Sequence, residues 1–257
     1  MGHTVQLDQQ RPGDPLMRRG GEVLVVVAHP DDETLGAGGT IARLSRHGLP
    51  IHCISMTNGT GARGADRSEA DQRRQAFIKA CDKLGITSSA IHSFDDQRLD
   101  SCALLDITQA IEEWAKEYKP SVVLTHSASD LNKDHRILLE AVMTAFRPYR
   151  STIELVASFE VCSTTEVGTL GGRAFNPTLF IDIEETLDVK LQALAYYTSE
   201  IGEFPHPRSI QTVSSLARHR GAVCGYVAAE AFEVHFLGLG KRSAMRALFE
   251  SPIIAAS

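Results

Sequence analysis

One short segment, Glu22 to Ala28, constrains the fold more than any other part of the chain, because valine and leucine fill its five central positions. Such an aliphatic run is typical of a strand in the middle of a parallel sheet, where helices cover both faces. The run ends abruptly in the polar sequence His-Pro-Asp-Asp-Glu at residues 29–33. This segment therefore predicts a buried central strand whose carboxyl end carries a dense group of ionisable side chains.

Strands and helices alternate along roughly the first 150 residues, as expected for βαβ units. Helices are predicted near 36–47, 68–84 and 101–118, and strands at 51–57, 91–94 and 121–126. The later part is less regular, with strands predicted near 155–161, 179–183 and 231–237, and helices near 188–198, after residue 207 and at the C-terminus. The predicted fold is α/β: a Rossmann-like, mostly parallel sheet with helices on both faces, in which the C-terminal third forms a cap over the sheet edge.

The length of 257 residues fits one domain, and no repeat, low-complexity tract or linker divides the chain. Residues 21–257 are predicted to form this domain, and residues 1–20, which lack the apolar core of a secretory signal, to be a flexible N-terminal lead-in. The net charge of −6 disfavours nucleic acid as a partner. The sequence leaves the oligomeric state open, a homo-oligomer included.

The compartment is indicated by apolar runs and cysteines. No apolar run approaches the roughly 18 residues of a membrane span, so no membrane partner is expected. The five cysteines are scattered and never spaced as C-x-x-C. This pattern suits a reducing compartment, and a cytoplasmic location is therefore expected.

Polar clusters follow two of the predicted strands, at residues 29–33 and 126–135. In an open α/β sheet, ligands bind at the carboxyl ends of the strands. His29 and Asp32 are three residues apart and can face one point in a turn that enters a helix, with Asp31 beside that point. His135 would supply a third ligand from the second loop. Two histidines, one carboxylate and an open fourth position are the ligand set of a catalytic zinc site.

The residues alone leave other interpretations open. Asp31 or Asp32 could instead cap the start of a helix. Residues 130–135 could instead form an Asx turn that leads into a helix. The glycines at 36–39 follow a strand, as in a dinucleotide site, but Ile41 replaces the last glycine of that fingerprint. Acidic residues also precede these glycines, where a pyrophosphate would have to lie.

The sequences Ala-His-Pro-Asp-Asp-Glu at 28–33 and Asp-Leu-Asn-Lys-Asp-His at 130–135 resemble the LmbE-like, or PIG-L, family of zinc-dependent N-acetyl-sugar deacetylases. The similarity extends from about residue 22 to about residue 237. It implies a hydrolase of a linear amide C–N bond that removes the N-acetyl group from an N-acetylglucosamine-type amino sugar or a glycosylated metabolite. It also implies one Zn²⁺ per chain, held by His29, Asp32 and His135, with a zinc-bound water as nucleophile and Asp31 as general base.

The chain departs from the family pattern at Asn132, where many relatives have a histidine that is thought to assist the tetrahedral intermediate. Asn132 still offers an amide donor, although it lacks the acidity of an imidazolium. His126 is the alternative candidate for this role, against an interpretation as a plain strand-end histidine. Asp134 and Asp130 are candidates to orient a ligand imidazole, against an interpretation as helix-start acids.

Substrate contacts are expected from Arg73 in the second helix, Arg63 in the loop before it, and His206 and Arg208 in a Pro-rich loop. Each of them would otherwise be a solvated surface residue. The expected partner is a small N-acetylated sugar or glycoconjugate. Two rival hypotheses are a zinc amidase that cleaves a larger N-acyl or thiol conjugate, and a non-catalytic protein that binds a sugar or nucleotide.

Overall fold

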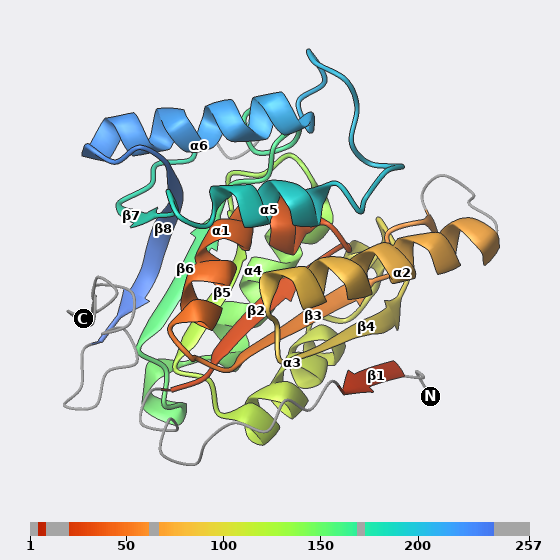
Figure 1. The fold of residues 1–257 in the computed structure, drawn as a ribbon. Coiled ribbons are helices and arrows are strands. Elements are labelled where there is room, and N and C mark those ends of the chain that lie inside the picture. Colours follow the sequence, from red (N-terminus) through yellow and green to blue (C-terminus); the bar gives the residue numbers. More distant parts are fainter. Residues whose placement is uncertain (1–4, 9–20, 62–66, 169–172, 239–257) are drawn as a thin grey trace.

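An eight-stranded sheet runs through the protein in the order β1-β4-β3-β2-β5-β6-β8-β7 (Figure 1). The structure is a computed structural model, and it describes residues 5–8, 21–61, 67–168 and 173–238. The five inner strands, which run parallel, are β4 (Ser88–Phe94), β3 (Ile51–Thr57), β2 (Val23–Val27), β5 (Val122–His126) and β6 (Leu155–Phe159). Antiparallel strands complete both edges: β1 (Val5–Asp8), β8 (Ala229–Leu237) and β7 (Leu179–Asp182). The predicted mostly parallel α/β fold is confirmed.

The aliphatic run of β2 lies in the middle of this sheet, and its five residues are fully buried. Successive side chains of a strand point to opposite faces. Val23, Val25 and Val27 therefore pack into one core, and Leu24 and Val26 into the other. The first core lies beneath four helices, α1 (Asp32–Arg46), α2 (Arg67–Leu84), α5 (Leu187–Leu194) and α6 (Ile210–Cys224). The second lies beneath α3 (Leu104–Tyr118) and α4 (Lys133–Ala145).

The direction in which the sheet grows reverses next to β2. The chain adds β3 and β4 on one side of β2, and then returns to place β5 and β6 on the other side. Ligands of open α/β sheets bind in the crevice at the carboxyl ends of the strands where this reversal occurs. The loops that follow β2 and β5 meet at this crevice, and they carry the two polar clusters of the sequence.

The glycine-rich sequence at 36–39 lies inside α1 and not in a phosphate-binding loop. A Cβ atom on Gly36 would lie 2.0 Å from Cδ2 of Phe159, and one on Gly39 would lie 2.7 Å from Cδ1 of Ile183. These glycines therefore allow α1 to approach β6 and the end of β7 closely. The structure does not support the dinucleotide interpretation.

A buried ion pair binds the backbone of α1 at the same turn. The Glu230 carboxylate of β8 accepts the backbone N–H groups of Gly39 and Thr40, at 2.9 and 2.7 Å. Lys190 of α5 donates to the Leu35 carbonyl at 2.8 Å and to Glu230 at 2.6 Å. The middle of α1 is thus held by polar groups from two elements of the C-terminal third.

The C-terminal third both covers and extends the sheet. Helix α5 packs on α1 and α2, and α6 packs on α5 and β8, whereas β8 and β7 continue the sheet beyond β6 (Figure 1). Of the predicted lead-in, residues 5–8 form the edge strand β1, which the sequence analysis did not predict. The rest of the lead-in lies outside the described residues, as does the predicted C-terminal helix.

Two smaller observations complete the fold. The sequence analysis placed a helix start at residue 101, but Ser101 belongs to a short 3₁₀ turn, and its hydroxyl donates to the Arg98 carbonyl. Helix α3 begins only at Leu104. Among the helices that the structure describes, none has the length and apolarity needed to cross a bilayer.

Candidate metal and catalytic site

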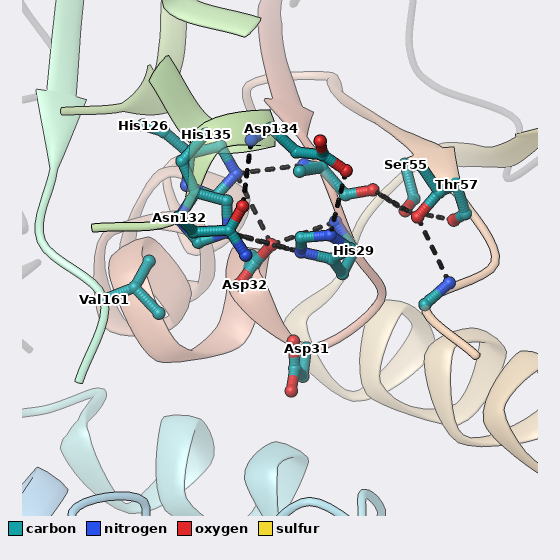
Figure 2. A network of polar contacts seen from close by, with 12 residues as sticks. His29, Asp31, Asp32, Ser55, Thr57, His126, Asn132, Asp134, His135 and Val161 are labelled. Carbon is teal, nitrogen blue, oxygen red and sulfur yellow. Dashed lines mark hydrogen bonds and ion pairs between the residues drawn. The ribbon is translucent and has the colours of Figure 1, made fainter. Parts of the chain in front are cut away.

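The end of β2 is held by polar groups from both neighbouring strands (Figure 2). The Ala28 N–H donates to Nε2 of His126 on β5 at 2.9 Å. The Ala28 carbonyl accepts from the Thr57 hydroxyl of β3 at 2.9 Å and from the Thr57 N–H at 3.0 Å. His29, the next residue, therefore leaves the strand from a fixed point.

Three buried side chains, here called the metal cluster, converge beside this point: His29, Asp32 and His135. His29 Nδ1 lies 3.1 Å from Asp32 Oδ2 and 3.2 Å from His135 Nε2, and the last two atoms are 3.3 Å apart. Among the described residues, Asp32 Oδ1 is buried without a hydrogen-bond partner. Zinc bonds of about 2.0–2.1 Å in a tetrahedron place ligand atoms roughly 3.3 Å apart, so this spacing fits a metal ion.

A carboxylate faces the far nitrogen of each histidine in the metal cluster. Asp130 Oδ2 lies 3.1 Å from His135 Nδ1, and it accepts the hydroxyls of Thr164 and Thr165 at 2.9 and 2.6 Å. Asp134 Oδ2 lies 3.5 Å from His29 Nε2. Metal-ligating histidines commonly have such partners, which fix the orientation of the ring. The structure therefore brings both predicted orienting acids to the metal cluster.

The metal cluster favours positive charge at its centre. Burial disfavours a charged imidazole at His29, but hydrogen bonds to Asp134, Asp32 and Asp96 outweigh it and raise the pKa of His29 well above its usual value. Burial likewise opposes the ionised form of Asp32, yet His135 and His126 hold the pKa of Asp32 well below its usual value. The same carboxylates would favour a bound cation at this point.

Asp31, although next in sequence to Asp32, belongs to a different group of charges. Its backbone has a φ of 125°, an uncommon conformation for a residue with a side chain. The strain of such a residue is on the order of 1–3 kcal/mol. As a result the Asp31 carboxylate points away from the metal cluster (Figure 2).

We call this second group the arginine cluster: Asp31, Arg73, Glu200 and Arg208. Asp31 Oδ2 accepts from Arg208 Nη1 at 2.9 Å and lies 3.2 Å from Arg73 Nη2. Arg73 also pairs with Glu200 and donates to the Pro30 carbonyl at 2.7 Å. Burial raises the pKa of Asp31 to about 6, although both arginines act in the opposite direction.

Asn132 and His126 occupy different kinds of position. Asn132 is the N-cap of α4, and its Oδ1 accepts the Asp134 N–H at 2.9 Å. The cap leaves the NH₂ end of this amide as a donor. His126 is fully buried and stacks on His135, with ring centroids 3.7 Å apart. Burial and the neighbouring His135 hold the pKa of His126 well below its usual value, and its Nε2 accepts the Ala28 N–H on the side of β2.

The residues predicted to contact substrate lie in different environments. Arg73 and Arg208 both reach Asp31, whereas His206 is exposed, and its Nδ1 accepts the Arg208 N–H at 3.2 Å. Arg63 lies outside the described residues.

Sequence analysis missed two acids that the structure places here. Asp96, whose Oδ1 lies 3.1 Å from His29 Nε2, follows β4 and was open to the same strand-end argument as the clusters. Glu200 carries no sequence signal, because only the packing of α5 against α2 brings it to Arg73.

Comparison with known proteins places this site in a family. The fold alone does not select a reaction, because the 4-carboxy-2-hydroxymuconate hydratase of Pseudomonas putida shares it, with a TM-score of 0.67, 22% identity, and coverage of 86% of this chain and 98% of that one. The N,N'-diacetylchitobiose deacetylase of Pyrococcus horikoshii also shares it, with a TM-score of 0.69, 18% identity and 85% coverage of both chains.

Sequence similarity is more specific than the fold. The family described as "PIG-L: GlcNAc-PI de-N-acetylase" matches residues 24–146. The chain is 30% identical over 190 residues to a probable N-acetyl-alpha-D-glucosaminyl L-malate deacetylase 2 of Bacillus cereus, over 69% of this chain and 83% of that protein. The chain belongs to the PIG-L, or LmbE-like, family of deacetylases, which are hydrolases of amide bonds.

Proposed function

We propose that this protein is a zinc-dependent N-deacetylase that converts the acetamide of an N-acetylglucosamine-type sugar, or of a glycosylated metabolite, into a free amine and acetate. The observation that carries the proposal is the convergence of His29 Nδ1, Asp32 Oδ2 and His135 Nε2, with the buried Asp31 next to them in sequence. The names of the relatives, which specify a glucosaminyl malate and a diacetylchitobiose, support this substrate class. The reaction is proposed for the cytoplasm, where free cysteines persist.

The metal cluster would hold the Zn²⁺ ion. Two imidazoles and one carboxylate, all buried, are a donor set that zinc prefers, and three protein ligands leave a fourth position for the reaction. When bound, Zn²⁺ would lower the pKa of a water molecule toward about 7 and polarise the amide carbonyl. Asp130 and Asp134 would keep the two imidazole rings oriented for the metal.

Asp31 would act as the general base. It is almost completely buried, it is not a member of the metal cluster, and its pKa of about 6 suits a group that exchanges protons near neutral pH. In this role its carboxylate, which faces Arg73 and Arg208 in this structure, would turn toward the attacking water, accept its proton and pass it to the leaving nitrogen. Asn132 would donate its amide N–H to the developing oxyanion, an effect on the order of 3 kcal/mol for one side-chain donor.

The two arginines would have different roles. Arg73 has a side chain that is 5% exposed, and it is fixed by Pro30 and Glu200, so it would hold Asp31 in place. The Arg208 side chain is 16% exposed and lies on a loop. We therefore assign to Arg208 the contact with the sugar.

The proposal is tested by measuring the metal content of the purified protein together with amine release from a panel of N-acetylhexosamines, with and without a chelator. We expect about one zinc per chain and release that the chelator abolishes. If the protein bound zinc and released no acetate, but released a longer acid from an N-acyl conjugate, the amidase hypothesis would be favoured. Failure to take up zinc would contradict the assignment of the metal cluster.

A further inference from the structure

A second cleft lies at the opposite end of the sheet from the metal cluster. It has a volume of about 730 Å³ and lies along α3, from Leu105 to Lys119, beside the C-terminal end of α4. Its lining includes Pro120 and Thr152, which precede strands β5 and β6. This part of the cleft, which also carries its basic side chains, is therefore at the amino ends of the parallel strands, whereas the metal cluster is at their carboxyl ends.

Four cationic side chains line this cleft: Lys116, Lys119, Arg147 and Arg150. All four are exposed, and none of them forms an ion pair with a carboxylate among the residues that the structure describes. Among the described residues that line the cleft, Glu112 is the one with an acidic side chain. The cleft is thus strongly basic in a chain whose net charge is −6.

The ends of the two helices do not account for this charge. A helix C-terminus carries about half a negative charge, so α3 and α4 together would offset about one positive charge. The four cations and Glu112 together have a formal charge of +3. After the helix ends offset about one charge, an excess of about two positive charges remains. From this excess, in a concave site of this volume, we propose that the cleft binds a phosphorylated small molecule through its phosphate group.

The neighbouring side chains indicate how such an anion would be held. The hydroxyls of Thr144 and Ser151 donate to the carbonyls of Glu140 and Arg147, so their protons are already used. Recognition therefore falls to the lysines and arginines, and guanidinium groups bind phosphate oxygens in a bidentate manner. Beside them the exposed ring of Tyr149 lies 5.5 Å from the Arg150 guanidinium carbon, a flat surface at the rim of the cleft.

The cleft is remote from the metal cluster. Helix α4 carries His135 in its first turn and lines the cleft with its last residue, Ala145. The ten residue steps from His135 to Ala145 advance about 15 Å along the helix, so an anion held by Arg147 and Arg150 does not touch the metal cluster. This inference does not depend on the proposed deacetylase function.

The test is isothermal titration of the full-length, zinc-loaded protein with inorganic phosphate, and separately with ADP, at low ionic strength. We expect one saturable site per chain for each probe, weakened at least tenfold in Arg147→Gln/Arg150→Gln. Raising the salt concentration should weaken it further, because the contacts are between charges. Tighter binding of ADP than of phosphate that is lost in Tyr149→Ala would assign the Tyr149 rim to a nucleotide ring, whereas equal affinity would restrict the site to the phosphate group.

Two matched variants keep the test decisive. Lys83→Gln/Arg218→Gln removes the same charge from exposed positions elsewhere, and it should bind within about twofold of the wild type. Lys116→Gln/Lys119→Gln should weaken binding as the arginine pair does. Equal losses in the cleft and control variants would mean general charge attraction. Full binding in both cleft variants would place the anion elsewhere, including at the zinc. Either result, or the absence of saturable binding, would overturn the proposal.

Discussion

The two halves of the site are built in different ways. The metal cluster and its two orienting acids come from two short segments, residues 29–32 and 130–135, at the ends of adjacent strands. The arginine cluster brings Asp31 together with Arg73 from α2, and with Glu200 and Arg208 from the chain that follows α5. The first half follows from local sequence and strand order, whereas the second requires distant segments to pack correctly. Metal binding and proton transfer should therefore be separable by mutation.

The largest effect should come from removing a member of the metal cluster. In His135→Ala we expect zinc to be lost and turnover to fall to that of the chelated protein, because two ligands do not retain the ion. Metal analysis after gel filtration, paired with amine release, measures both. Full zinc occupancy in this variant would show that His135 is not a ligand. His219→Ala, at an exposed histidine of α6, is the control.

Asp31→Asn should separate proton transfer from metal binding most clearly. The amide cannot accept the proton, so turnover should fall by about 10²–10⁴-fold, while zinc content stays at the wild-type level. The same pair of measurements applies, with Asp188→Asn, an exposed acid at the start of α5, as the control. If this variant turned over substrate normally, Asp31 would not be the base.

A weaker change on the metal side is Asp130→Asn. Its amide would hold His135 less well, so zinc affinity should fall by roughly 10–100-fold, and added zinc should restore activity. A competition titration against a zinc chelator measures the affinity. Thr165→Val removes one hydrogen bond to the same carboxylate, and it should have a smaller effect in the same direction. An unchanged affinity in both variants would remove Asp130 from the metal half.

The smallest of these effects is expected for Arg208→Gln. Since Arg73 still pairs with Asp31 in this variant, the loss should be limited to about 1 kcal/mol, or roughly fivefold in kcat/KM, with zinc content unchanged. Arg218→Gln serves as the matched control. A selective rise in KM would identify Arg208 with sugar binding. A fall in kcat alone would mean instead that Arg208 positions Asp31.

The same division decides what could be predicted from the sequence. The convergence of His29, Asp32 and His135 could be predicted from three segments: the aliphatic strand, the turn after it and the second loop. The reason is that the carboxyl ends of adjacent parallel strands meet at one edge of the sheet. These segments did not indicate that Asp31 has a backbone φ of 125°, which turns its side chain away from Asp32. Nor did they predict that His126 would face the back of His135, since the end of a strand does not define where its last side chain points.

The contact between Glu230 and the backbone of α1 bears on the order in which the enzyme is made. The helix that begins at Asp32 has a glycine-rich turn whose N–H groups bind a carboxylate of the chain itself, 190 and 191 residues further on. On the ribosome His29, Asp32 and His135 are all synthesised long before that carboxylate exists. A nascent chain therefore holds every member of the metal cluster before the support of α1 is complete, and the last described strand, β8, is the one that completes it.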